Sequence, residues 1–354
     1  MKLAVGLPVL AEVRDSGFLE SVAEFRDEIG EVYFAWIGEP SGRSVSSGTG
    51  GRVDPTAQQC LESDLRALRE MGLRLDLLCN ANCYGPGAAS TRLADHITSL
   101  VDHLLGAAGL DTVTTASPFI AAVIKRAFPE LETRASVNMR IGTVEGMRYL
   151  ADVFDSFHLQ REYNRDRERI ADVAQWCRRN GKTLCLLANS GCLYSCSGQT
   201  FHDNLVAHEG EWLGPEGRHP GFAQGLDGAT DVPPGVLVCQ RFLDQPENWV
   251  SLVQATWVRP EDLHHYEADF AVAKLATRMH QRPGQVIAAY ARRSFRGNLL
   301  DLLEPGHGQL LRGHVIDNTR FPPDWFDRVS SCRHDCRGCT YCAEILAQVL
   351  QRAE

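Results

Sequence analysis

The chain has 354 residues, and 44% of them are hydrophobic, so it can bury a large core. Its formal net charge of -9 disfavours a nucleic acid partner, because binding to a phosphate backbone requires clustered Lys and Arg side chains. No run of about 18 apolar residues occurs, and residues 1–11 carry neither a basic leader nor a cleavage site. We therefore expect no membrane span and a cytoplasmic location.

Short apolar runs alternate with amphipathic stretches, a pattern that is typical of a parallel sheet covered by helices. Strands are expected at Lys2–Pro8, Val32–Gly38, Leu73–Ala81, Asp111–Ser117, Thr133–Met139, Ser156–Tyr163 and Thr183–Asn189, with an eighth at Ser251–Val258 or Phe270–Ala276. Helices are expected at Ala57–Met71, Arg92–Ala108, Pro118–Ala127, Thr143–Val153, Asp166–Asn180, Pro283–Leu303 and Ala343–Arg352. Gly72, Gly109 and Gly181 follow three of these helices, where a left-handed cap residue is expected.

Seven or eight βα units of about 30 residues favour an α/β fold of the TIM-like (β/α)8 barrel class. A doubly wound sheet normally carries a Gly-rich fingerprint after its first strand, and residues 6–10 have no such pattern. We predict a barrel over residues 1–293 with a long loop at 197–234. A C-terminal cysteine-rich extension follows over residues 294–354.

The strongest chemical signal is a group of four cysteines near the C-terminus, Cys332, Cys336, Cys339 and Cys342. Thiols stay reduced in the cytoplasm, so the twelve cysteines of the chain call for another role than disulfides. Zinc ribbons usually separate two pairs of cysteines by a longer stretch, whereas this array is continuous. The spacing favours a 4Fe-4S cluster. A zinc site and a chance grouping of thiols are the alternatives.

A second group, Cys192 and Cys196, follows the expected strand at 183–189, and barrels form their active sites at the carboxyl ends of strands. Cys239 is predicted either to join these two thiols or to lie in the core. Cys83 is more simply a wall or core thiol than a fourth ligand. Cys185, inside a strand, is predicted to be an inert core thiol.

Polar residues near the ends of other strands are candidates for substrate contacts. Arg161, Glu162 and His202 are the predicted catalytic residues, and a surface or capping histidine is the alternative interpretation of His202. Asn80, Asn82, Asn138, Asn189, Lys274 and Arg278 are the predicted substrate-binding residues. No nucleophile elbow, zinc-protease helix or phosphate-binding loop occurs, so those hydrolase classes lack support.

Three stretches resemble peptidase family U-32, the collagenase-like group with barrel folds and Fe–S clusters. They are residues 158–162, which end in Arg-Glu, residues 191–199, which contain Cys192 and Ser-Gly-Gln, and residues 273–278, which match a Lys-Ile-Glu-Gly-Arg segment. The chain departs from the family at Thr200, where a cysteine is expected, and at Ala276, where a glutamate is expected. The C-terminal cysteine array is not a general family feature.

Members similar to this chain act in oxygen-independent hydroxylation of ubiquinone precursors, tRNA or rRNA, so the resemblance implies Fe–S redox chemistry more than proteolysis. We expect one or two 4Fe-4S clusters, a small-molecule substrate, an electron donor and a homologous partner subunit. Cys192, Cys196 and Cys239 would hold one centre, and the C-terminal array the other. The alternatives are a radical S-adenosylmethionine-type enzyme, a non-catalytic Fe–S partner subunit and a U-32 type peptidase.

Overall fold

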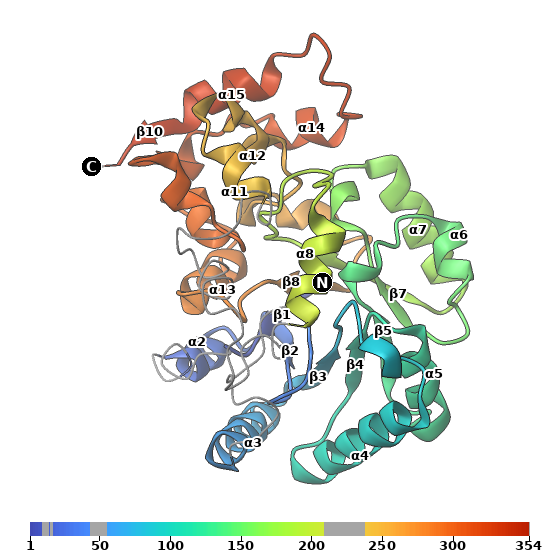
Figure 1. Cartoon of the computed structure of the whole chain (residues 1–354). Coiled ribbons are helices and arrows are strands. Elements are labelled where there is room, and N and C mark those ends of the chain that lie inside the picture. The colour runs from blue at the N-terminus through green and yellow to red at the C-terminus, as the bar shows by residue number, and fades with distance from the viewer. Residues whose placement is uncertain (9–13, 15–16, 43–54, 209–237, 354) are drawn as a thin grey trace.

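The computed structural model describes residues 1–8, 14, 17–42, 55–208 and 238–353. Eight parallel strands close into a barrel in chain order, which confirms the predicted TIM-like fold, and the helices lie around it (Figure 1). The strands are β1 (Lys2–Gly6), β2 (Ile29–Phe34), β3 (Arg74–Cys79), β4 (Thr112–Thr115), β5 (Glu132–Ala135), β6 (Ser156–His158), β7 (Thr183–Leu187) and β8 (Val272–Leu275).

Four of the five helices expected between the first seven strands are confirmed to within about two residues, whereas the helix expected at Thr143–Val153 ends at Arg148 and the helix at Phe18–Glu24 was not predicted. The helices in this part of the chain are α2 (Phe18–Glu24), α3 (Pro55–Glu70), α4 (Thr91–Ala107), α5 (Pro118–Ala127), α6 (Val144–Arg148) and α7 (Arg167–Arg179). The hydroxyl of Ser90 accepts a hydrogen bond from the Leu93 amide and caps the start of α4. Gly72, Gly109 and Gly181 have φ angles of 80°, 79° and 63°, so the three predicted left-handed helix ends are confirmed.

The structure decides between the two candidates for the eighth strand. Phe270–Ala276 contains β8, whereas Ser251–Val258 begins inside the helix α12 (Val250–Gln254). The apolar residues Leu252 and Val253 of α12 are buried. A short apolar run occurs in buried helices as well as in buried strands, so the sequence does not distinguish the two. The region 197–234, expected as a loop, contains the helix α8 (Gln199–Ala207), and residues 209–234 lie outside the described part of the chain.

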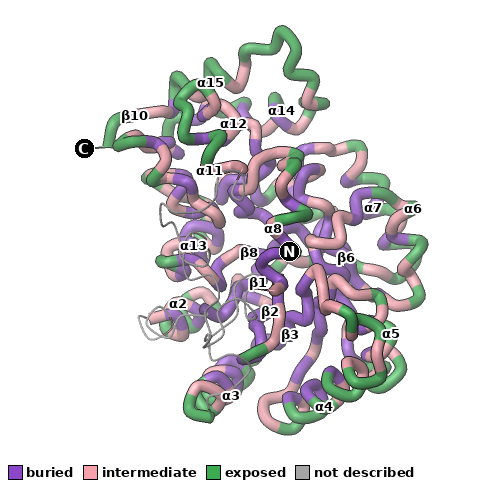
Figure 2. Tube along the Cα trace, viewed as in Figure 1, coloured by how far each residue is buried: buried purple, intermediate pink, exposed green. Residues whose placement is uncertain are grey.

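The predicted helix at Pro283–Leu303 is shorter than expected. It ends as α13 (Pro283–Ala291), and a 3-10 helix at Leu299–Leu302 follows. The C-terminal segment then forms β9 (His314–Ile316), α14 (Trp325–Ser330), α15 (Tyr341–Val349) and β10 (Leu350–Arg352), with β9 and β10 antiparallel. In Figure 1 this segment lies beside α11 (Val238–Leu243) and α12. The stretch between α14 and α15 is mostly exposed (Figure 2).

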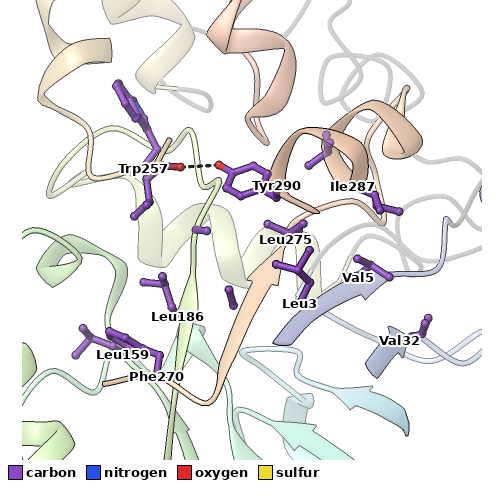
Figure 3. Packing of buried hydrophobic residues seen from close by; sticks show 14 of the residues in the cluster. Leu3, Val5, Val32, Leu159, Leu186, Trp257, Phe270, Leu275, Ile287 and Tyr290 are labelled. Carbon is purple, nitrogen blue, oxygen red and sulfur yellow. Dashed lines mark hydrogen bonds between the residues drawn. The ribbon is translucent and has the colours of Figure 1, made fainter. Parts of the chain in front are cut away.

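The two faces of the strands differ in chemistry. Apolar side chains such as Leu3, Leu186 and Leu275 belong to one large core, which Figure 3 shows together with Tyr290 of α13. Alternate residues point into the barrel, because successive strand side chains point to opposite faces. These inward positions are mostly polar or charged and include Glu31, Asp76, Thr114, Glu132, Arg134, Ser156, His158 and Lys274. The barrel interior is therefore held by ion pairs and hydrogen bonds.

Among the described residues, no helix is long and apolar enough to cross a membrane.

Candidate active site

Three of the predicted substrate-binding residues meet at the carboxyl end of the barrel, around the backbone of Ser41 and Gly42. Asn80 follows β3, and its side-chain oxygen accepts a hydrogen bond from the Gly42 amide at 2.9 Å. A Cβ atom on Gly42 would lie 2.5 Å from Nδ2 of Asn138, so the side chain of Asn138 lies directly against Gly42. Arg278 follows β8 and donates to the Ser41 hydroxyl at 3.0 Å.

Arg161 and Glu162, two of the predicted catalytic residues, follow β6 in a 3-10 helix and are both buried. The guanidinium of Arg161 lies 3.5 Å from the Ser190 hydroxyl, and its Nε lies 3.9 Å from Oε1 of Glu162. Among the described residues, Oε2 of Glu162 has no hydrogen-bond partner. A buried carboxylate oxygen in this position can accept a hydrogen bond from a bound substrate or a water molecule.

Two other predicted substrate residues are engaged inside the protein. The side chain of Asn189 donates to the carbonyl oxygens of Leu302 (2.8 Å) and Ala276 (3.3 Å) and accepts from the Ala276 amide at 2.6 Å. Lys274 points into the barrel, with its ammonium 3.8 Å from the centre of the Tyr33 ring. Burial lowers the pKa of Lys274 to about 8. These contacts give Asn189 and Lys274 structural roles that strand-end position alone does not reveal.

Asn82 and His202 come from different parts of the chain, Asn82 from the turn after β3 and His202 from α8. Asn82 follows Asn80 and is half-buried, and its Oδ1 has no hydrogen-bond partner among the described residues. His202 is half-buried on α8.

A cavity of about 340 Å³ lies beyond the carboxyl end of β7, and thiols from three parts of the chain line it. Cys196 comes from the loop after β7, Cys239 from α11 and Cys336 from the C-terminal array. Burial, together with the neighbouring thiols of Cys192 and Cys196, raises the pKa of Cys239 to about 11. Cys239 and Cys196 line the same cavity, and whether Cys239 joins Cys192 and Cys196 as a ligand stays a prediction.

The C-terminal array reaches the same cavity through aromatic and polar contacts. The rings of Tyr194 and His334 are stacked, with centroids 3.8 Å apart and an interplanar angle of 4°. Nε2 of Gln254, on α12, lies 3.9 Å from the sulfur of Cys336. Tyr194, Gln254 and His334 all line the cavity. These contacts place one end of the array against the loop that carries Cys192 and Cys196.

The four thiols of the array lie near one another at the surface. Cys332, Cys336 and Cys339 are exposed, Cys342 is half-buried, and none of the four forms a disulfide. Burial raises the pKa of Cys342 to about 11, and the other three thiols contribute in the same direction. Within the part of the chain that the structure describes, no three His, Cys, Asp or Glu side chains are grouped as the ligands of a metal ion.

Cys185 and Cys83 lie outside these two groups of thiols. Cys185 is fully buried in β7, and burial raises its pKa to about 12, which is typical of an inert core thiol. The sulfur of Cys83 accepts a hydrogen bond from the Gly85 amide at 3.4 Å within its own turn.

Two buried residues near the site escape sequence reasoning. Arg165 lies over the rings of Trp257 and Trp325, and a hydrogen bond joins His307 to the backbone of Gly191, the residue before Cys192. Neither belongs to a motif, and both reach the site through contacts between segments far apart in the chain.

No protein-family model matches the chain. The uncharacterized protease MJ1657 of Methanocaldococcus jannaschii is 22% identical over 324 residues, which cover 91% of this chain and 90% of that protein. The solved structure of the U32 peptidase Mk0906 superimposes with a TM-score of 0.52 at 16% identity, covering 77% of this chain and 92% of the other. At this identity the structural likeness shows a shared fold. The sequence likeness extends over nearly the whole of both chains.

Proposed function

We propose that this chain, a divergent relative of peptidase family U-32, is an enzyme whose thiolates hold iron at the carboxyl end of its barrel. One observation carries the proposal: a single cavity of about 340 Å³ is lined by Cys196 and Cys239 on the barrel side and by Cys336 of the C-terminal array. Barrel enzymes place their chemistry at this end of the strands.

The donor set has the chemistry that iron–sulfur clusters require. Cys192, Cys196 and Cys239 form a group of neighbouring thiols, and the four thiols of the C-terminal array form another. Thiolates are soft ligands that select Fe–S clusters or zinc over magnesium and calcium. A bound cluster supplies one-electron chemistry, or an open iron position that acts as a Lewis acid. Since the described thiols are not grouped as ligands, binding would have to draw them together.

The polar residues at the barrel mouth suit a small polar substrate. Arg278, held by Ser41, and Arg161, beside Ser190, offer positive charge, and Asn80 and Asn138 offer amide groups. Glu162 adds a carboxylate oxygen that can accept a proton or a hydrogen bond. These groups would bind and orient the substrate, and an external electron donor would complete a redox cycle. The reaction most in keeping with such a site is an oxygen-independent hydroxylation or related modification.

Anaerobic purification followed by iron, sulfide and zinc analysis tests the proposal. We expect a brown protein that bleaches in air, with iron and sulfide in similar amounts. Cys192→Ala and Cys332→Ala should each lower the iron content, whereas Cys60→Ala, which removes an exposed thiol of α3, should not. Colourless protein that contains stoichiometric zinc, or no metal, would overturn the assignment.

A peptidase is the second candidate, and the names of the two related proteins favour it. The carboxylate of Glu162, buried beside Arg161, is the group that would act on a peptide or on the attacking water. Incubation with gelatin in the presence of a chelator distinguishes this reaction from iron chemistry. Cleavage that persists with the chelator and disappears in Glu162→Gln would support a peptidase, and lack of cleavage by the metal-loaded protein would exclude gelatin as a substrate.

A further inference from the structure

A further ion pair lies at the carboxyl end of the barrel. Arg140 follows β5, Asp203 lies on α8, and Nη2 of the guanidinium is 3.7 Å from Oδ2 of the carboxylate. This separation is too long for a hydrogen bond. Both atoms are buried, and neither has a hydrogen-bond partner in the part of the chain that the structure describes. The side chain of Asp203 is 3% exposed and that of Arg140 is 33% exposed, so a ligand can approach the pair from the guanidinium.

The loose geometry of this pair is unfavourable by itself. The buried pair of Arg259 and Asp262 shows the usual arrangement, with two hydrogen bonds of 2.8 Å. Buried charged groups whose hydrogen bonds are not made destabilise the folded state. The backbone of Arg140 adds strain, because its φ of 54° lies in the left-handed region that residues other than glycine rarely adopt. Strain and unmade hydrogen bonds at one position are typical of a binding site.

Arg140 belongs to the same surface of the barrel as the candidate substrate residues. Asn138 precedes it by two residues in the turn after β5. The carbonyl oxygen of Ile141, the next residue, accepts a hydrogen bond from the Gln160 amide at 2.8 Å. Gln160 directly precedes Arg161, so this bond joins the turn that carries Arg140 to the turn that carries Arg161. The ion pair therefore borders the site at the barrel mouth.

A ligand with a single charge would satisfy one member of this pair and not the other. An anion that accepts hydrogen bonds from Arg140 would compete with Asp203 and leave that buried carboxylate without a cation, which is strongly unfavourable. A cation bound to Asp203 would have the converse effect on Arg140. A zwitterion supplies an acceptor to one group and a donor to the other. In an α-amino acid these two charges are on neighbouring carbon atoms, as close together as the pair requires.

We propose that Arg140 and Asp203 bind a small zwitterion of the α-amino acid class at the barrel mouth. The guanidinium donates to the carboxylate of the ligand, and the carboxylate of Asp203 accepts from its ammonium group. The inference rests on the part of the proposed function that assigns a small polar substrate to this end of the barrel, and it names the class of that substrate. With the ligand bound, positive and negative groups alternate, and no buried charge lacks a partner.

Isothermal titration calorimetry of the wild type with the ordinary α-amino acids, one at a time, tests the proposal. The amino acid that binds best is then compared with its amide, which lacks the carboxylate charge, and with its N-acetyl derivative, which lacks the ammonium charge. We expect each derivative to bind roughly tenfold or more weakly, because each loses a charge-assisted contact. Absence of binding by every amino acid at millimolar concentration, or equal binding of either derivative, would overturn the proposal.

Two variants assign the charges to their residues. In Arg140→Gln the amino acid and its amide should bind within about threefold of each other, and in Asp203→Asn so should the amino acid and its N-acetyl derivative. Arg292→Gln is the control, because Arg292 pairs with Glu24 at 2.8 Å in an exposed position, and it should leave the wild-type preferences unchanged.

A purely structural ion pair would give a different result. Arg140→Gln and Asp203→Asn would then lower the melting temperature but keep the wild-type preference over both derivatives, and this outcome would overturn the proposal. If neither variant folds, the comparison of the derivatives with the wild type carries the test. Iron is measured in the same preparations: protein that contains iron and binds no amino acid overturns this inference alone, whereas protein that binds an amino acid without iron overturns the iron chemistry alone.

Discussion

Arg134 is the side chain on which the charged interior of the barrel depends. It lies on β5 with 1% of its surface exposed and forms a two-point ion pair with Glu31 of β2. It also lies 3.6 Å from Asp76 of β3 and 2.9 Å from Glu132. Burial raises the pKa of Asp76 to about 7, and the charge of Arg134 opposes that rise. One guanidinium thus serves three carboxylates inside the barrel.

We expect Arg134→Met to destabilise the protein by about 3–5 kcal/mol, because it leaves buried carboxylates without their cation. Urea unfolding measures the change. Arg74→Met is the matched control, since Arg74 pairs with Glu132 at 2.7 Å from a half-exposed position and should contribute less than about 1 kcal/mol. Equal losses in the two variants would show that the interior network does not carry the stability assigned to it.

We expect His307 to make the stability of the protein depend on pH. Burial lowers its pKa to about 4, although a hydrogen bond with the Gly191 backbone acts in the opposite direction. The unfolded chain, with a histidine pKa near 6.5, therefore takes up the proton first as the pH falls. Stability is fully present above pH 6.5 and is lost between pH 6.5 and pH 4, by at most about 3 kcal/mol.

His307→Asn removes the ionisable group and suits the left-handed backbone at this position, where φ is 56°. Between pH 6.5 and pH 4, we expect the free energy of unfolding to fall by up to about 3 kcal/mol less in the variant than in the wild type. Urea unfolding curves recorded across this range give the comparison. A variant whose stability falls as steeply as that of the wild type would exclude His307 as the source.

At the scale of elements, the end of β7 and the segment 304–307 hold the Cys192 loop in place. The Glu304 amide donates to the Asn189 carbonyl and the Gly191 amide donates to the Glu304 carbonyl, both at 3.0 Å. A Cβ atom on Gly191 would lie 1.9 Å from the Pro305 carbonyl oxygen, a distance that no packing permits. The absence of a side chain at Gly191 therefore lets the two segments lie together beside Cys192.

Gly191→Ala should force these segments apart and destabilise the protein by about 1–3 kcal/mol, as overpacking does. It should also lower the iron content as far as Cys192→Ala does, because the loop moves with its neighbour. Gly106→Ala is the control: Gly106 lies within α4 with nothing near its missing side chain, so the change should be neutral or slightly stabilising. Unaltered stability and iron content in Gly191→Ala would contradict this role for the segment.

Local sequence signals predict many of the strands and helix ends, but not the contacts between distant segments. Alternation and capping predict the strands β1 to β7 and the helix ends at Gly72, Gly109 and Gly181, because these signals are local. Strand-end position likewise predicts that Asn80, Asn138 and Arg278 lie together at the carboxyl end of the barrel, where they meet Ser41 and Gly42. It cannot tell that Lys274 points into the barrel or that Asn189 is bound by backbone groups. Those outcomes, like the placement of Arg165 and His307, depend on which distant segments meet.

At the scale of the whole molecule, the barrel and the C-terminal segment share one core. The large apolar cluster runs from Leu3 through Tyr290 to Leu302, Trp325 and Val349. The indoles of Trp257 and Trp325 are stacked at 5.8 Å across the boundary between the two parts. The cavity with its thiols has walls from both parts as well. A shared core of this kind couples the folding of the segment to that of the barrel.

We therefore expect the chain to unfold in a single transition, in which tryptophan fluorescence and far-UV circular dichroism change together with urea. A chain that ends at Arg293 should not fold, because it lacks Leu302, Trp325 and Val349, and it would expose the faces that they cover. Each buried side chain of this size contributes about 1.5–3 kcal/mol, so three such losses approach the whole stability of an ordinary domain. Two separate transitions, or a folded truncated barrel, would show instead that residues 294–354 are an independent unit, and the thiol cavity would then lie between two domains that can separate.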